Sequence, residues 1–464
     1  MQNISLKLAD GLMIRKIGAD VVVFPQKNPF AIFTDRLMYF TDVASDIIAR
    51  IDGFTNLSTI VDELIKLYDT DPLTLKNDVE AFIVDLQKSG ILHEETMISQ
   101  KASELEHKAS SKNISYGYFC KELEDKAIEN FIPLWGTLEL THRCNLKCVH
   151  CYLGKPHKSD ELSTHEVINI LSELHEAGCL FLVITGGEPL LREDFPIILQ
   201  AAKERGFLIF LFTNGTLIDN TAIELLSKYP PLSVDISLYG ISEEVYKNTT
   251  RTTQGREDVI EAIKNLTSCG INVRVKTPLL KINDIEIEEM YRFCNSLGIE
   301  FTHNAGITPI VNGECSPCNL RVQPKRVVEL DINIQQRRET YLNCPEAFHK
   351  LKPSDRLLLC RAGRSLFCID PSGKLETCVL FREPKFDLRE NTFKESWSKL
   401  NKYIDNLRPN GKYKCGNCEL LSYCTPCPGW AKWEYGIHEA PIEYLCNIAK
   451  ERRQYFQNLK GGEK

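Results

Sequence analysis

Residues 141–152 read THRCNLKCVHCY and contain three cysteines in the spacing C-x3-C-x2-C. These are Cys144, Cys148 and Cys151. A protein-bound 4Fe–4S cluster takes one cysteine per iron. Three thiolates therefore leave one iron open to bind another molecule. The alternative is a zinc ion, for which His142 or His150 would supply the fourth ligand.

Apolar runs on both sides of this motif predict strands that alternate with helices. The predicted strands are residues 136–141, 181–185, 208–212, 232–237, 271–277 and 300–307. The predicted helices are residues 163–178, 194–205, 221–228, 256–268 and 285–297, the first with a capping box of Ser163 and Glu166. This alternation predicts an α/β fold with a parallel sheet. The cysteine motif follows the first strand, at the end where barrels of this kind carry their chemistry.

Two more motifs follow predicted strands: GGEP at residues 186–189 and TNG at residues 213–215. Together with the cysteine motif, they make the chain resemble the radical S-adenosylmethionine (SAM) superfamily. The resemblance implies a partial (β/α)6 TIM-type barrel, a 4Fe–4S cluster on the three cysteines, and SAM on the open iron. Because the three motifs occur together, we prefer a cluster to zinc at this site.

The resemblance also implies which residues contact SAM. The backbone of Gly186 and Gly187 would bind the SAM amino group, with help from Glu188, and Pro189 would fix the turn. Polar groups near the ribose or the methionine part would be Asn214 and Ser237. Arg251 is a candidate for the SAM carboxylate, although a solvated loop arginine is an equal alternative. His150 stands where the family usually has an aromatic residue beside the adenine.

A second set of cysteines fills the C-terminal third, in CRAGRSLFCIDPSGKLETC from Cys360 and CGNCELLSYCTPC from Cys415. It resembles the SPASM extension, which carries two auxiliary 4Fe–4S clusters, although two residues rather than three precede the last cysteine of the second stretch. The alternative is structural zinc. The resemblance assigns one cluster to Cys415, Cys418, Cys424 and Cys446. It assigns the other to Cys360, Cys378 and Cys427, with Cys368 as a candidate fourth ligand.

Composition agrees with metal binding. The chain has 464 residues and 18 cysteines, its first residues lack the apolar core of a signal peptide, and it has no apolar run of about 18 residues. We therefore expect a cytoplasmic protein with no membrane span, and metal sites rather than disulfides. The net charge of −7 argues against general nucleic-acid binding. We expect the remaining cysteines to be small, buried apolar side chains: Cys120, Cys179, Cys269, Cys294, Cys315, Cys318 and Cys344.

The first residues predict a separate small domain with two strands joined at Gly18 and helices at residues 42–51, 58–68 and 75–89. It resembles the winged-helix RiPP recognition element, related to the pyrroloquinoline-quinone chaperone, which binds the leader of a ribosomal precursor peptide as an added strand. A domain for dimer contacts is the alternative. The expected domain limits are 1–97 for this domain, 98–132 for a linker, 133–312 for the barrel, 313–345 for a bridging region and 346–464 for SPASM.

These resemblances imply a peptide maturase, because ISLYG (236–240) and KTPLLKIND (276–284) are most similar to enzymes that make thioethers in sactipeptides and ranthipeptides. A 5′-deoxyadenosyl radical would take hydrogen from a carbon of a cysteine-containing precursor peptide, and a peptide thiolate would bond to that carbon. An auxiliary cluster would accept the extra electron, and a flavodoxin or ferredoxin would supply reducing electrons. We expect the barrel to cleave SAM without residues up to about 95.

Other reactions by the same machinery are alternatives: carbon–carbon crosslinking, tyramine excision, or formylglycine formation in sulfatases. A non-catalytic iron–sulfur scaffold is disfavoured by the complete motifs. The sequence predicts no acid–base pair, and Tyr239 stands where many SPASM relatives carry an aspartate.

Overall fold

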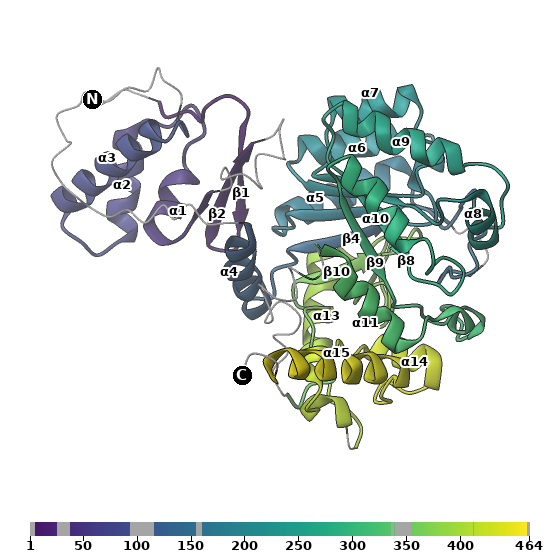
Figure 1. The fold of residues 1–464 in the computed structure, drawn as a ribbon. Coiled ribbons are helices and arrows are strands. Elements are labelled where there is room, and N and C mark those ends of the chain that lie inside the picture. The colour runs from purple at the N-terminus through teal and green to yellow at the C-terminus, as the bar shows by residue number, and fades with distance from the viewer. Residues whose placement is uncertain are drawn as a thin grey trace.

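The structure is a computed structural model that describes most of the chain. The described residues are 5–25, 38–92, 116–154, 160–335, 338, 354–411 and 413–461, with the backbone alone described at 116–122 and 459–461. In it, a small N-terminal domain lies beside a larger body that contains the rest of the chain (Figure 1). Within the described ranges, no helix is both long and apolar enough to cross a lipid bilayer.

The N-terminal domain combines an antiparallel sheet with a group of helices. In its described part the strands lie in the order β1 (Leu12–Ile17), β2 (Asp20–Pro25) and β3 (Met38–Phe40). The helices are α1 (Asp42–Ile48), α2 (Leu57–Leu67) and α3 (Pro72–Lys88), which confirms the predicted helices. Gly18 takes a φ of +64° between β1 and β2, a conformation that favours glycine, as the predicted turn requires.

Parallel strands form the centre of the larger body and agree with the strands predicted from the sequence. They are β4 (Trp135–Glu139), β5 (Phe181–Thr185), β6 (Leu208–Thr213), β7 (Ser233–Ser237), β8 (Val273–Pro278) and β9 (Glu300–Asn304). Neighbours in the sequence are neighbours in the sheet, and each pair is parallel. This arrangement supports an α/β radical SAM-type core.

Helices connect these strands. They are α5 (Thr164–Glu176), α6 (Phe195–Glu204), α7 (Asn220–Lys228), α8 (Glu243–Thr250), α9 (Arg256–Ser268) and α10 (Ile287–Ser296). The capping box of Ser163 and Glu166 is present at the start of α5. Helix α8 was not predicted, because its sequence EEVYKNTT is short and has no clear apolar period.

The C-terminal region extends the same sheet, which the sequence did not predict. Strand β10 (Leu366–Ile369) pairs in parallel with β4, and β11 (Lys374–Glu376) and β12 (Phe386–Asp387) follow it in antiparallel pairs. Gly136 of β4 makes the close contact with Phe367 feasible, since a Cβ there would lie 2.7 Å from the Phe367 ring. The C-terminal cysteines are thus attached directly to the strand that precedes the core cysteine motif.

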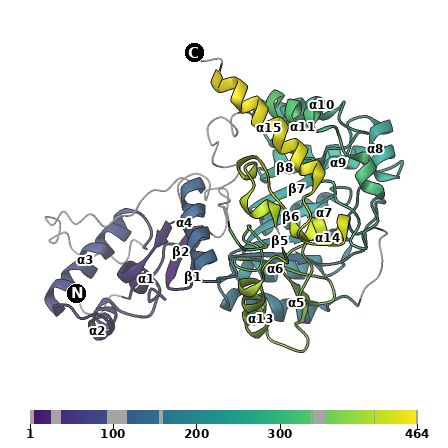
Figure 2. The same ribbon diagram turned by 90° about the horizontal axis from the view of Figure 1, so that it is seen from below.

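Helices of the C-terminal region lie in the lower part of the larger body in the view of Figure 1. They are α11 (Pro324–Asn333), α13 (Phe393–Asn406), α14 (Pro428–Tyr435) and α15 (Glu443–Gly461). Figure 2 shows α15 lying beside α11. The two helices are joined where Arg452 contacts Asp331 at 3.2 Å, and Asp331 lies 3.0 Å from His303 of β9.

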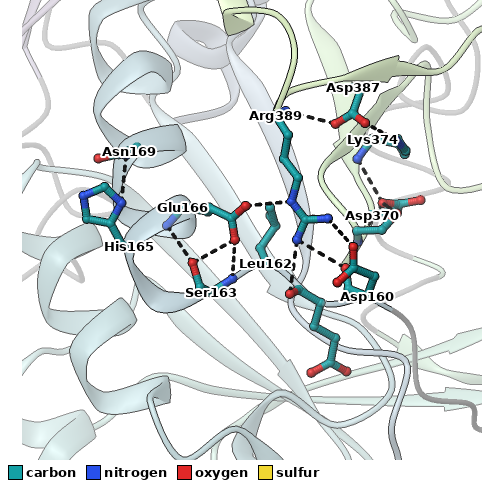
Figure 3. Close-up of polar contacts among 12 residues, drawn as sticks. Asp160, Leu162, Ser163, His165, Glu166, Asn169, Asp370, Lys374, Asp387 and Arg389 are labelled. Carbon is teal, nitrogen blue, oxygen red and sulfur yellow. Dashed lines mark hydrogen bonds and ion pairs between the residues drawn. The ribbon is translucent and has the colours of Figure 1, made fainter.

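A second connection between the C-terminal region and the core lies at the surface. Arg389, just after β12, contacts Glu166 in the first turn of α5 at 2.6 Å and Asp160 at 2.7 Å (Figure 3). Glu166 also accepts a hydrogen bond from the backbone of Ser163, so the arginine is attached to the cap of the helix. Two of these side chains keep about a third of their surface exposed, so this connection contributes little energy.

The N-terminal domain packs against the amino ends of the parallel strands. Ile17 and Phe24 of its sheet form one apolar cluster with Phe181 and Phe210 of the core. Helix α4 (Tyr116–Glu129), from the stretch expected to be a linker, adds Leu123 and Ala127 to the same cluster. This contact counts against the expectation that the barrel cleaves SAM without residues up to about 95, which stays a prediction, because removal of those residues would expose this apolar end.

Arg15 of β1 strengthens this contact. Its side chain is 2% exposed and donates to the carbonyl oxygens of His175 and Arg205, at the C-terminal ends of α5 and α6. Cations are stabilised at helix C-termini, where unpaired carbonyl groups point outward. Burial lowers the pKa of Arg15 to about 10, so the guanidinium remains charged at neutral pH. The domain is thus docked at the end of the sheet opposite the sequence motifs.

Candidate functional site

The predicted motifs meet at the carboxyl ends of the parallel strands. The core cysteine loop follows β4, GGEP follows β5, and TNG follows β6. The amide of Gly187 donates to the carbonyl of Thr141 at 2.6 Å, and the amide of Glu188 donates to that of Arg143 at 2.8 Å. A Cβ on Gly186 would lie 2.2 Å from the Thr141 oxygen. The glycines are therefore required for GGEP to pack against the cysteine loop.

Glu188 connects GGEP to the next strand. Its side chain is fully buried and accepts hydrogen bonds from the hydroxyl of Thr213 at 2.8 Å, and from the amides of Asn214 and Leu190 at 2.7 and 3.1 Å. Burial raises the pKa of Glu188 to about 7 despite these donors. Both carboxylate oxygens are thus engaged by the chain itself. If Glu188 also helps to bind the SAM amino group, as the resemblance implies, it must do so while it keeps these hydrogen bonds.

The three core cysteines lie together in the loop after β4. Burial raises the pKa of the Cys148 thiol, and the charges of Cys151 and Cys144 raise it further. The Cys144 sulfur accepts from the amide of Leu146 at 3.4 Å and from the side chain of Asn214 at 3.8 Å. Thiols in such surroundings become thiolates when a metal cation supplies positive charge. The donor set therefore fits an iron–sulfur cluster.

His150 and Tyr239 flank the cysteine loop with aromatic surface. Their ring centroids are 5.4 Å apart, and the Tyr239 hydroxyl interacts with Cys148 and with Ser237 at the end of β7. The Nδ1 atom of His150 is buried and has no hydrogen-bond partner among the described residues. Burial lowers the pKa of His150 to about 4, so the ring is neutral. An unpaired buried nitrogen fits a site that receives a polar aromatic ligand such as adenine.

Arg251 directly follows Thr250, whose carbonyl contacts the cysteine loop, and its role toward the SAM carboxylate stays a prediction. It is exposed, takes a left-handed φ of 60°, and ends helix α8. The same helix end has a role that the sequence did not indicate. The carbonyls of Thr249 and Thr250 accept hydrogen bonds from the amides of Val149 and Lys147, each at 3.0 Å. The backbone of helix α8 therefore holds the core cysteine loop in place. Backbone contacts of this kind do not depend on a side-chain motif, so the sequence could not predict them.

A buried group of charges lies below the cysteine loop and was also missed. The Tyr152 hydroxyl donates to Glu139 at 2.8 Å, and Arg382 donates to both Glu139 and Glu376. Burial opposes ionisation of Glu139, but hydrogen bonds from His142 and Arg382 prevail and lower its pKa to about 2. Burial instead raises the pKa of Glu376. A pairing across 243 residues leaves no local sequence signal.

The C-terminal cysteines form two groups. Burial raises the pKa of the Cys415 and Cys424 thiols, and nearby charge on the other cysteines of the set Cys415, Cys418, Cys424 and Cys446 raises it further, as expected for one cluster. Cys378 is influenced in the same way by Cys360 and Cys427, as expected for the other. In the part of the chain that the structure describes, no three His, Cys, Asp or Glu side chains converge tightly enough to hold a single metal ion. The assignment of each group to a cluster stays a prediction.

Cys368 is separated from the second group by its place in the sheet. It is fully buried in β10, opposite Thr137 of β4. Burial raises the pKa of its thiol, and the largest charge effects on it come from Glu139 and Arg382, ahead of Cys378. Cys368 thus lies beside the buried charge group, and its role as a fourth ligand of the second cluster stays a prediction.

The remaining cysteines divide into buried and exposed ones. Cys179 and Cys294 are buried, as predicted, whereas the prediction is wrong for Cys269 and Cys315, which are exposed. Cys318 is partly buried. The Cys120 side chain and Cys344 lie outside the described positions.

Family comparisons agree with this geometry. Residues 138–294, which include the core cysteines and GGEP, match the family model described as the Radical SAM superfamily. This part of the chain is therefore similar to the radical SAM superfamily. Residues 34–92 match the model described as Coenzyme PQQ synthesis protein D (PqqD). The chain thus joins a segment that matches the PqqD model to a segment that matches the Radical SAM model.

Individual proteins are similar over longer stretches. The antilisterial bacteriocin subtilosin biosynthesis protein AlbA of Bacillus subtilis is 26% identical over 83% of this chain and 83% of its own length. The mycofactocin maturase MftC of Mycobacterium tuberculosis is 27% identical over 63% of this chain and 77% of its own. The fold resembles that of Streptococcus suis SuiB bound to precursor peptide SuiA, with a TM-score of 0.62 at 17% identity, covering 95% and 99% of the two chains.

Proposed function

We propose that this chain is a radical SAM maturase that joins a cysteine sulfur to a carbon atom in a ribosomally synthesised precursor peptide. The observation that carries the proposal is the docking of the domain that matches the PqqD model, through Arg15 and its apolar neighbours, onto the part of the same chain that matches the Radical SAM model. The relatives support a peptide substrate, since they include a bacteriocin biosynthesis protein and a maturase.

The N-terminal domain would act as a winged-helix RiPP recognition element. Strand β3 is at an edge of its sheet in the described residues, and a side chain of helix α3 contacts it. Phe40 of β3 and Phe82 of α3 contact each other edge to face, with ring centroids 6.0 Å apart. A leader peptide added to this edge would gain backbone hydrogen bonds from β3 and side-chain contacts from α3.

The residues at the strand ends would bind SAM and the core cluster. Cys144, Cys148 and Cys151 would hold the cluster, and the carbonyl groups of Gly186 and Gly187 would accept from the SAM amino group. Pro189, Asn214, Ser237 and His150 would complete the SAM site, and Arg251 is a candidate for the SAM carboxylate. When bound, the cluster and SAM would supply a carbon-centred radical able to take hydrogen from an unactivated carbon.

The remaining cysteines would hold auxiliary clusters of a SPASM domain. One set is Cys415, Cys418, Cys424 and Cys446, and the other is Cys360, Cys378 and Cys427. A thioether made from C–H and S–H releases two hydrogens, so a redox group must accept electrons. Auxiliary clusters have that capacity, and a flavodoxin or ferredoxin in the cytoplasm would keep the core cluster reduced.

Mass analysis of the modified precursor tests the proposed function. Incubation with SAM, reductant and the cysteine-containing precursor should lower the peptide mass by about two daltons per bridge, because two hydrogens are lost. Alkylation should find one free thiol fewer per bridge. A mass loss with all thiols still free would replace the thioether by a carbon–carbon crosslink, and an unmodified peptide would overturn the proposal.

A further inference from the structure

One cysteine pair lies outside all three groups described above. Cys315 and Cys318 form a C-x2-C motif in the loop after β9, at the start of the short 3-10 helix η4 (Ser316–Leu320). The Cys318 amide donates to the Cys315 carbonyl at 2.9 Å, which brings the two side chains close enough to interact, and the Cys315 thiol donates to the carbonyl of Gly313 at 3.6 Å. Both are free thiols. Sulfur atoms in contact can form a disulfide with little movement of the backbone.

The loop that carries this pair lies next to the radical SAM site. The amide of Val311 donates to the carbonyl of Tyr152 at 2.9 Å, one residue after the core ligand Cys151. On its other side, a Cβ on Gly313 would lie 3.3 Å from the carbonyl oxygen of Trp433 in α14. The pair is therefore at the carboxyl ends of the strands, where a peptide substrate must arrive.

The two thiols differ in access to solvent. Cys315 is exposed, whereas Cys318 is partly buried and lies near Arg321. Arg321 is fixed by two hydrogen bonds to Glu434, at 2.9 and 2.5 Å. In such a pair the outer thiol can attack a disulfide from solution, and the inner thiol can only complete the exchange.

Exposed apolar side chains lie on the loop that carries the pair and at the end of α14, which this loop contacts at Trp433. Val311 of the same loop is 37% exposed, and Tyr435 and Ile437, at the end of α14, are 43% and 56% exposed. Exposed apolar residues near a reactive group offer contact area to a peptide chain. This surface favours a peptide as the partner of the dithiol.

We propose that Cys315 and Cys318 form a redox-active dithiol that reduces disulfides of the precursor peptide beside the radical SAM site. The proposal rests on the proposed function, because thioether formation needs peptide cysteines as free thiols. The Cys315 thiolate attacks one sulfur of the peptide disulfide and releases one peptide thiol. Cys318 then attacks the Cys315 sulfur and releases the other.

Atoms and electrons balance in this exchange. The dithiol loses two protons and two electrons and becomes the Cys315–Cys318 disulfide, and the peptide disulfide gains them and becomes two thiols. A low-molecular-weight thiol such as glutathione restores the dithiol by the same exchange. The step needs neither SAM nor an iron–sulfur cluster, so it can be measured separately from peptide modification.

Oxidised glutathione is the first probe, applied to the full-length, cluster-loaded protein without other reductant. Peptide mapping should find a Cys315–Cys318 disulfide in the wild type and a glutathione adduct on Cys315 in the Cys318→Ser variant. In the Cys315→Ser variant, Cys318 should stay unmodified over the same time. Cys315 should react at least about tenfold faster than the exposed Cys269, which is the internal reference, and Cys269→Ser should leave disulfide formation unchanged. Equal rates at Cys315 and Cys269 would overturn the proposal.

The disulfide form of the precursor peptide is the second probe. The wild type should convert it to free thiols, and both serine variants should lose this reaction while keeping their iron content and SAM cleavage. Loss of iron in either variant would make the pair a cluster ligand and overturn the proposal. The wild type could reduce the peptide disulfide and yet never lower the mass of the reduced peptide. That result would support the redox-active dithiol and overturn the proposed thioether formation.

Discussion

Arg382 donates hydrogen bonds to both carboxylate oxygens of Glu139, at 2.8 and 3.0 Å, with Glu139 fully buried and Arg382 9% exposed. Glu139 ends β4, directly before the core cysteine loop. Arg382 belongs to the C-terminal region that carries the other cysteines, and it also donates to Glu376 at 2.9 Å. The pair therefore connects the two cysteine-rich parts of the chain through the interior.

We predict that Arg382→Gln destabilises the protein by about 3–5 kcal/mol, because it leaves a buried carboxylate without its partner. Anaerobic thermal unfolding of the cluster-loaded protein would measure the loss. Arg389→Gln is the matched control, since Arg389 also links the C-terminal region to the core but at the surface (Figure 3). It should cost less than about 1 kcal/mol. Similar losses of stability in the two variants would contradict the prediction that the buried ion pair contributes more than the exposed one.

We predict that replacement of Cys144, Cys148 and Cys151 by Ala abolishes SAM cleavage and removes about four irons per chain, as one thiolate per iron requires. Iron analysis and detection of 5′-deoxyadenosine would measure both effects. The C-terminal cysteines serve as the control, because their irons should remain. Continued 5′-deoxyadenosine production by the triple variant would exclude this loop as the site of chemistry.

We predict that Cys368→Ala leaves the iron content unchanged, because the thiol lies in β10 beside Glu139 and Arg382. Cys378→Ala should instead remove about four of the roughly twelve irons expected for three clusters. Iron and zinc analysis after anaerobic reconstitution would separate the two variants. Stoichiometric zinc with only about four irons would show that the C-terminal cysteines are structural.

The sequence alone predicted the parts of the fold that depend on local residue patterns. The parallel strands, the capping box at Ser163 and the glycines of GGEP follow from periodicity, capping and turn chemistry. Long-range pairing was not predictable in the same way. The contact of Arg382 with Glu139 and the pairing of β10 with β4 join residues more than 200 positions apart. These partners meet only when the sheet has assembled. Neither Arg382 nor Glu139 stands out in its own segment of the sequence.

The docking of the N-terminal domain is a second example, and it changes how leader binding must be tested. Ile17, Val22 and Phe24 are ordinary strand residues in the sequence, yet they cover the amino ends of the core strands. Deletion of residues up to about 95 would expose Phe181 and Phe210 and would impair the core as well as any peptide site. A point variant away from this contact is therefore needed.

We predict that Phe82→Ala weakens binding of the leader peptide about tenfold or more, because Phe82 supports the edge strand β3 through Phe40 and borders the proposed groove. Fluorescence anisotropy with a labelled leader would measure binding to the full-length protein. Peptide modification at low substrate concentration should slow in parallel, since tethering raises the local concentration of the peptide. SAM cleavage without peptide should not change, because Phe82 belongs to the apolar cluster of the N-terminal domain and not to the one that contacts the core.

Leu73→Ala is the matched control on the same helix. Leu73 is 67% exposed at the start of α3, so its truncation should leave leader binding within about twofold of the wild type. Thermal unfolding of both variants would verify that the domain remains folded. If a folded Phe82→Ala protein binds the leader as tightly as Leu73→Ala does, the groove between β3 and α3 is not the leader site. The N-terminal domain would then serve to close the amino end of the sheet through Arg15 and Ile17.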